Sequence, residues 1–156
     1  MDLRTDAIDL WVFSRNAETP RYLLLQTSQE KADRWFGGGR FWQIPGAFLQ
    51  GTESVVAAAQ RSLGDLGLTA KSIWAVEHVY PIYNRRAESL MLIPVFVAEI
   101  ESLGSPRLDW EHSEAAWCTA DECMQRLSFR GLREGLEWVR LYISENPSPR
   151  LEFRLA

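Results

Sequence analysis

Hydrophobic residues along the chain form several short, dense runs that predict β-strands. Residues 7–13 and 22–26 are rich in apolar and aromatic side chains and flank the turn-like sequence SRNAETPR, so they predict two strands joined by a hairpin-like loop. Residues 72–83 and 90–100 are longer runs of the same kind, separated by the charged sequence NRRAES. They predict a second pair of strands, longer than the first.

Other parts of the chain show the spacing and the end signals of helices. Residues 52–66 predict a helix with Ser54 or Thr52 as its N-cap. The sequence TADE, which begins at Thr119, matches a capping box and predicts a helix that continues through Leu127. Apolar residues spaced by three or four positions then predict a final amphipathic helix: Phe129, Leu132, Leu136, Val139 and Ile143.

The remaining segments predict short strands and loops. Residues 41–44 and 47–50 predict short strands on either side of a proline–glycine turn, and residues 115–118 predict another. Residues 27–40 end in three glycines and predict a flexible loop. The tail, residues 151–155, has three interpretations: an edge strand, a segment that crosses to a partner subunit, or a loosely packed terminus.

The order of these elements defines a fold class. Strands on both sides of a central helix, closed by C-terminal helices, indicate an α/β or α+β sandwich with a mixed sheet. No internal repeat or linker interrupts the chain, so residues 1–156 predict a single domain. Hydrophobic residues make up 46% and charged residues 24% of the chain, which excludes disordered, collagen-like and coiled-coil classes.

Charge and cysteine content narrow the function further. The formal net charge is −4 and the sequence pI is about 5.3, so no basic field attracts a nucleic-acid duplex. No segment approaches the roughly 20 apolar residues of a membrane span, and we expect a soluble, cytoplasmic protein without membrane partners. The only cysteines are Cys118 and Cys123, and there are two histidines. Neither a disulfide framework nor a four-ligand zinc site is expected.

Residues 41–68, FWQIPGAFLQGTESVVAAAQRSLGDLGL, carry the most informative pattern. This stretch resembles the Nudix box, G-x5-E-x7-R-E-U-x-E-E-x-G-U, in which U is an apolar aliphatic residue. Glu53 fits the first glutamate, Arg61 follows at the required spacing, and Leu63 fits the first aliphatic position. The opening glycine falls on Ala47, although the preceding proline–glycine pair preserves a turn common in the family. The resemblance implies a Nudix-type α/β/α sandwich with a central mixed β-sheet.

The match decays after Arg61. An ungapped count puts Ser62, Asp65 and Leu66 where the family has its three helix glutamates, and helical geometry places these positions on one face. The closing glycine, Gly67, arrives one residue early, which implies a deletion. Asp65 therefore corresponds to either the last or the penultimate glutamate, and helix phase counted from Arg61 favours the ungapped assignment.

The missing acids bear on metal binding. Mg²⁺ takes oxygen ligands, and in the family the helix carboxylates hold the cations that neutralise a diphosphate and generate a water nucleophile. The resemblance implies Mg²⁺ or Mn²⁺ held by Glu53, Asp65 and an acid recruited from elsewhere. Ser62 and Leu66 replace expected glutamates, so tight metal binding of the family type is not expected.

Glu111 is the best candidate for the recruited acid. Its surroundings, LDWEHSEAAW, resemble the glutamate–histidine stretch before a tryptophan in family members that cleave nucleoside or dihydroneopterin triphosphates. A solvated acidic loop is the alternative interpretation. The candidate catalytic residues are therefore Glu53, Arg61 and Glu111.

Three further residues are candidates for substrate binding. Trp42 and Gln43 belong to the run FWQ, which resembles the run that enters the box in the same subgroup. Arg85 is a candidate because a guanidinium matches the geometry of phosphate. A core position for Trp42 and a solvated turn for Arg85 are the alternatives.

Two functions follow from the resemblance. The first is a divergent Nudix hydrolase that cleaves the diphosphate linkage of a nucleoside triphosphate or related nucleotide. The second is a catalytically inactive Nudix-fold protein that binds a nucleotide or acts as a regulatory module. An apolar plug formed by Leu66 would favour the second. The family also implies a homodimer.

Overall fold

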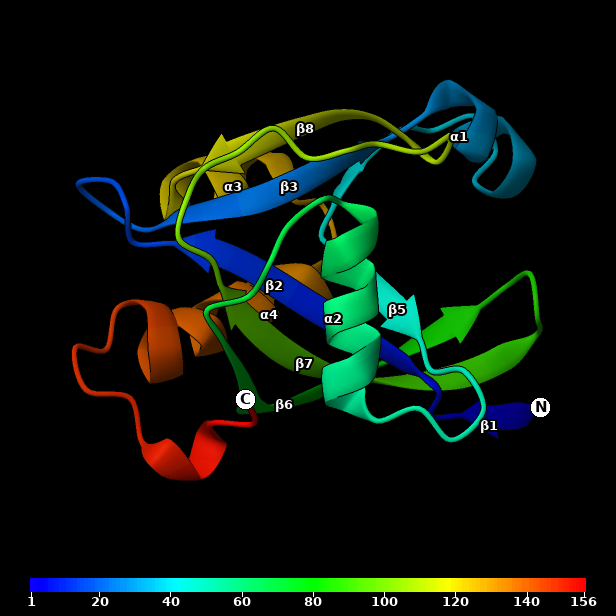
Figure 1. Ribbon diagram of the computed structural model, residues 1–156. Coiled ribbons are helices and arrows are strands. Elements are labelled where there is room, and N and C mark those ends of the chain that lie inside the picture. The colour runs from blue at the N-terminus through cyan, green and yellow to red at the C-terminus, as the bar shows by residue number, and fades with distance from the viewer.

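The structure, a computed structural model, describes residues 1–156 and contains one mixed eight-stranded sheet with α2 on one face and α4 on the other (Figure 1). The strands are β1 (Asp2–Arg4), β2 (Ala7–Ser14), β3 (Arg21–Thr27), β4 (Trp42–Gln43), β5 (Gly46–Phe48), β6 (Ser72–Asn84), β7 (Ser89–Glu99) and β8 (His112–Cys118). The helices are α1 (Gln29–Trp35), α2 (Val55–Asp65), α3 (Ala120–Arg126) and α4 (Arg130–Val139). This architecture confirms the predicted mixed-sheet α+β class. None of the helices is long and apolar enough to cross a lipid bilayer.

The strands β2 and β3 pair at one end and separate along the rest of their length. β7 pairs antiparallel with β6 on one side and parallel with β1 and β2 on the other. β2 and β3 pair only through Phe13 with Tyr22 and Ser14 with Arg21. Beyond that point β2 pairs with β5, whereas β3 pairs with β4. The residues around the predicted proline–glycine turn therefore fill the space between the two strands.

Gly46 is the residue that lets β5 approach β2 closely. A Cβ at this position would lie 2.7 Å from the carbonyl oxygen of Ile8, closer than side-chain carbons come to backbone oxygens. The neighbouring carbonyl of Pro45 accepts a hydrogen bond from the Leu10 N–H at 2.9 Å. This approach brings the start of the Nudix-like segment against the central sheet.

The core has two layers because successive side chains of a strand point to opposite faces. On one face Trp11 is fully buried with Leu136 of α4, and on the other Leu10 is fully buried with Leu63 of α2. The run of residues 7–13 is hydrophobic almost throughout because both of its faces are covered. α2 and α4 are thereby fixed on opposite sides of β2.

The predicted helices are confirmed, with one change at the last of them. Ser54 caps α2 by accepting a hydrogen bond from the Ala57 N–H at 3.1 Å. The capping box that begins at Thr119 is present at α3. The final helix is regular to Val139 and then widens into one π-helical turn, Arg140–Ser144. The widening is local and keeps Ile143 buried in the core.

The prediction of a flexible loop over residues 27–40 is wrong for its first half, which forms α1. Ser28 is the N-cap, and its Oγ accepts a hydrogen bond from the Lys31 N–H at 3.0 Å. Glu30 and Arg34 form an ion pair of 2.8 Å one turn apart. The helix buries only two residues, so the sequence has no apolar repeat that would reveal it.

The C-terminal tail pairs with β6 of the same chain. Leu155 donates its N–H to the Ile73 carbonyl at 2.8 Å, and Arg154 forms an isolated bridge with Trp74. A 3₁₀ turn, Leu151–Phe153, precedes this contact. Of the three interpretations of the tail, the structure supports an edge addition.

The surroundings of two helical glycines predict opposite effects of their substitution by alanine. A Cβ at Gly131 of α4 would overlap the ring of Tyr80 in β6, so Gly131→Ala should lower the free energy of unfolding by about 1–3 kcal/mol. Gly64 of α2 has open space around its Cβ position, so Gly64→Ala should raise that free energy by about 0.5–1 kcal/mol. Urea denaturation of both variants measures the two changes. Equal stability of the variants would contradict close packing of α4 on Tyr80.

Candidate functional site

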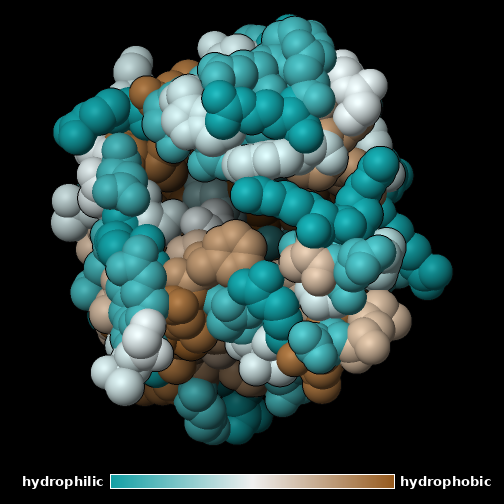
Figure 2. Space-filling model, turned by 90° about the vertical axis from the view of Figure 1, so that its right-hand side faces the viewer, coloured by the Kyte–Doolittle hydropathy of each residue, from teal (hydrophilic) through white to brown (hydrophobic).

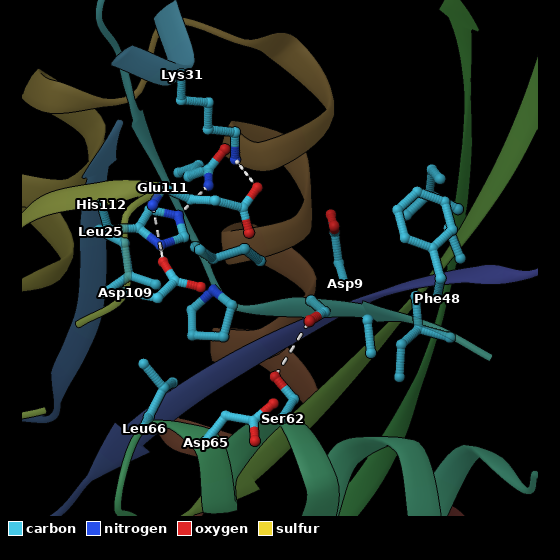
Figure 3. A pocket seen from close by; sticks show the side chains of 18 of the residues that line it. Asp9, Leu25, Lys31, Phe48, Ser62, Asp65, Leu66, Asp109, Glu111 and His112 are labelled. Carbon is cyan, nitrogen blue, oxygen red and sulfur yellow. Dashed lines mark hydrogen bonds and ion pairs between the residues drawn. The ribbon is translucent and has the colours of Figure 1, made fainter. Parts of the chain in front are cut away.

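A cleft of about 770 Å³ lies between α2, the short strands β4 and β5, and the segment that leads into β8. Figure 2 views the molecule from the right-hand side of Figure 1 and shows a hollow where hydrophobic and hydrophilic side chains meet. Figure 3 shows the cleft from close by, with side chains of α1, α2, β2 and β5 around it. Residues far apart in the chain therefore share this space.

The face of α2 that the sequence singles out does line the cleft, but it brings a single acid. Ser62, Asp65 and Leu66 all border the space, as one helix face requires. The Ser62 hydroxyl donates a hydrogen bond to the Gly46 carbonyl at 3.1 Å. Leu66 is buried and packs in the core layer that contains Leu63. One of the three positions is thus bound to the backbone, and another is an apolar plug.

Glu53 and Arg61 form an ion pair with each other. Two guanidinium nitrogens of Arg61 donate to the two carboxylate oxygens of Glu53, each at 2.9 Å. Arg61 also donates to the Phe48 carbonyl at 2.8 Å, and Glu53 accepts from the Gln50 N–H at 3.0 Å. The hydrogen bonds from Arg61 lower the pKa of Glu53. Arg61 borders the cleft and Glu53 does not, so this pair fastens the β5–α2 connection.

The residues present do not fit the divalent cation that the Nudix-box resemblance implies. No group of three or more His, Cys, Asp and Glu side chains in the chain is arranged to hold a metal ion. Asp65 is the only carboxylate that α2 directs to the cleft, and the oxygens of Glu53 are already bonded to Arg61. A hard cation such as Mg²⁺ requires several oxygen ligands around it, and these residues do not provide them.

A polar cluster forms the opposite wall of the cleft. The buried Lys31 of α1 lies 3.3 Å from a carboxylate oxygen of Glu111. The amide of Gln43 is hydrogen-bonded to Nε2 of His112, and Nδ1 of His112 lies 3.5 Å from Asp109. Burial lowers the pKa of His112, and the positive charge of Lys31 lowers it further. A neutral imidazole is therefore favoured, with Nε2 free to accept the Gln43 N–H.

The sequence-predicted candidates divide into two groups. Gln43 and Glu111 lie together in the cleft wall. Trp42 packs instead against the core on the other side of β4, and the guanidinium of Arg126 lies 4.7 Å from its ring centroid. Arg85 lies in the turn between β6 and β7 and does not line the cleft.

Asp9 lies on the cleft floor and is not among the site residues predicted from the sequence. It projects from β2 into the space (Figure 3) and accepts a hydrogen bond from the hydroxyl of Tyr80. Burial raises the pKa of Asp9 to about 6, although the Tyr80 hydrogen bond acts in the opposite direction. A signal existed, because Asp9 is the only charged residue in the apolar run of residues 7–13.

Arg107 is the second residue that the sequence did not reveal. It borders the cleft, and its backbone N–H donates to the Leu66 carbonyl at 2.8 Å, which holds the loop against the end of α2. Its guanidinium forms no ion pair with any acid of the chain. No pattern marks this arginine, because it lies in an irregular segment.

Comparisons with known proteins identify the family and the fold. The NUDIX domain family matches residues 3–139 of the chain. No curated protein matches the sequence.

Among solved structures, a Listeria monocytogenes protein assigned to the NUDIX hydrolases superposes with a TM-score of 0.76 at 15% identity, over 94% of this chain and 99% of that one. An Ap4A hydrolase from C. elegans gives a TM-score of 0.72 at 16% identity, over 92% and 100%. The NUDIX domain of NrtR from Shewanella oneidensis, solved with ADP ribose, gives 0.67 at 19% identity, over 90% and 87%. At such low sequence identity, the TM-scores establish a shared fold alone.

The environment of Asp9 predicts a pH-dependent gain in stability for Asp9→Asn. Because the pKa rises from 3.8 to about 6 on folding, the native state binds the proton more tightly. The contribution of Asp9 to the free energy of unfolding therefore falls as pH rises from about 4 to about 6. The asparagine does not titrate, so the variant should be about 1–3 kcal/mol more stable at pH 7.5 and equal to wild type near pH 4. Urea denaturation at both pH values measures this, and a difference independent of pH would contradict it.

Proposed function

The chain belongs to the Nudix family, and from this premise we propose that it binds a nucleotide in the cleft without hydrolysing the diphosphate linkage. The face that α2 turns to the cleft supports this proposal above all. Of the three positions on that face, Ser62 is bonded to the Gly46 carbonyl, Leu66 is buried in the core, and only Asp65 is an acid. A cation that neutralises phosphates would find one carboxylate there.

Two positively charged side chains provide another means of holding phosphate. Arg107 borders the same cleft as the α2 face and has no acidic partner, so its five N–H donors are free for phosphate oxygens. Lys31 lies in the opposite wall, paired with Glu111 at 3.3 Å. A phosphate group that enters the cleft loses hydrogen bonds to water and gains charge-assisted hydrogen bonds to these two side chains. No metal ion is needed for this attraction.

The family relatives are consistent with a nucleotide ligand. The NrtR NUDIX domain was solved with ADP ribose, and the C. elegans protein is an Ap4A hydrolase. Both compounds join phosphates to an adenosine. Apolar and polar side chains both line the cleft, which suits a molecule with a flat ring at one end and anionic groups at the other.

Hydrolysis of the diphosphate linkage is the second candidate function. One observation favours it, because Asp65 and Glu111 border the same cleft from opposite walls. These acids, with Glu53 and Arg61 behind them, are the residues through which a divergent Nudix hydrolase would use Mg²⁺ or Mn²⁺. The homodimer that the family resemblance implies remains a prediction.

Nucleotide binding should persist without a metal ion and depend on Arg107. Isothermal titration with ADP and GDP in EDTA should give the same dissociation constant as in Mg²⁺. Arg107→Ala should weaken binding about 10- to 100-fold, because a charge-assisted hydrogen bond to phosphate is lost. Arg130→Ala is the matched control, since Arg130 is exposed on α4 outside the cleft. Binding that disappears in EDTA would contradict the proposal.

The two functions also differ in turnover. Wild-type protein should release no product from nucleoside triphosphates, dinucleoside polyphosphates or nucleotide sugars with Mg²⁺ or Mn²⁺. Ser62→Glu/Leu66→Glu adds the missing acids, and Ser62→Glu alone keeps the buried Leu66 in case the double variant unfolds. If the wild-type protein turns over any of these compounds, and Asp65→Asn and Glu111→Gln abolish that turnover, the protein is a hydrolase and the proposal of binding without hydrolysis is rejected.

A further inference from the structure

One end of the cleft is an apolar recess around a single carboxyl group. Asp9 and Ala7 project from the same face of β2, and the pairing of β6 with β7 brings Ile82 opposite Met91 beside them. Phe48 of β5 stands across from Asp9 (Figure 3). The walls of this recess are suited to the faces of a flat ring, whereas its floor carries the Asp9 carboxyl. The other polar residue beside Ile82 and Met91 is Asn84, whose amide oxygen already accepts from the Arg86 and Ala87 N–H groups and whose amide nitrogen lies 3.3 Å from the Met91 sulfur.

The Asp9 carboxyl is held in place from behind. The hydroxyl of Tyr80 donates to Oδ2 and is the only side-chain group of the protein that bonds Asp9. Tyr80 is in turn confined, because its ring packs directly against Gly131 of α4 and lies beside Ile93 of β7. Oδ1 has no partner, so an oriented acceptor faces the space.

This arrangement weakens the fold. An ionised carboxylate in an apolar recess opposes folding at neutral pH, as the raised pKa of Asp9 records. An asparagine would accept the same Tyr80 hydrogen bond without that cost. A destabilising acid in a cleft is typical of a position that serves function.

Resting on the proposed function, we infer that Asp9, oriented by Tyr80, recognises the base of the nucleotide and selects a ring edge with two adjacent N–H donors, as guanine presents. A carboxylate has only acceptors and pairs best with two parallel N–H groups. The 1-NH and 2-amino groups of guanine meet that requirement. Adenine offers one donor beside an acceptor, and hypoxanthine lacks the 2-amino group. The pterin ring shares the guanine edge, so it is a second source of the same chemistry.

The distribution of apolar and charged residues along the cleft is consistent with a base bound at Asp9. The recess around Asp9 is apolar, whereas Arg107, Lys31 and the α2 face lie among the other lining residues. A guanine nucleotide directs its base and its phosphates to different ends in the same way. The base contacts Asp9, and the phosphates meet the arginine and the lysine.

The test compares ligands that differ by one group. Isothermal titration in EDTA at pH 7.5 would use GDP, IDP and ADP with wild-type protein. GDP should bind about 10- to 100-fold more tightly than IDP, because IDP lacks the 2-amino group and so loses one hydrogen bond to the carboxylate. Asp9→Asn should remove this preference, and Tyr80→Phe should reduce it. Asp121→Asn, an exposed residue of α3, is the matched control and should keep it.

The outcomes separate this inference from the proposed function. Equal affinity for GDP and IDP, or an Asp9→Asn variant that keeps the preference, overturns the role of Asp9 while nucleotide binding stands. No binding of any of the three overturns both. Dihydroneopterin triphosphate is the fourth ligand. If it binds wild-type protein more tightly than GDP and binds Asp9→Asn more weakly, Asp9 recognises the same ring edge in a pterin. Thermal unfolding of each variant shows whether it is folded at the temperature of the titration, so that a loss of binding is not caused by unfolding.

Discussion

The ion pair between Glu53 and Arg61 fixes the connection between β5 and α2, and the shape of the cleft depends on that connection. Arg61 bonds both carboxylate oxygens and the Phe48 carbonyl, so it ties the helix to the end of β5. Ser62 adds a second tie one residue later, to the Gly46 carbonyl. Because β5 is itself pressed against β2 at Gly46, α2 is held at a fixed distance from the central sheet. The segment thus keeps a scaffolding role without a full set of acids.

The same geometry explains why this scaffold differs chemically from the Nudix box it resembles. A helix face with three carboxylates would repel itself unless cations were bound there. Here that face carries one acid, one hydroxyl bonded to the backbone, and one leucine that packs in the core. The leucine stabilises the fold by apolar burial, whereas a glutamate at its position would require a counter-charge. In the proposed function, Arg107 and Lys31, which lie outside α2, provide the positive charge that attracts phosphate.

A second chain of contacts runs along the face of the sheet that α4 covers and ends at the cleft. Because Gly131 has no side chain, the ring of Tyr80 packs directly against α4. The Tyr80 hydroxyl then donates a hydrogen bond to Asp9 on the cleft floor. The packing of α4 therefore sets the orientation of a carboxyl group that faces the cleft. The raised pKa of Asp9 shows that the fold tolerates an unfavourable charge there.

Sequence alone determined the strands other than β1, α2 to α4 and the fold class, because hydrophobic runs, caps and the Glu53-to-Arg61 spacing are local signals. It also identified the face of Ser62, Asp65 and Leu66, since helix phase follows from counting. It missed α1, which buries two residues and is stabilised by its cap and an ion pair. Only the tertiary structure separated Gln43 and Glu111, which meet in the cleft, from Trp42, which packs in the core. It alone brought Asp9 and Arg107 to the same cleft, because their positions depend on strand pairing and loop packing between distant segments.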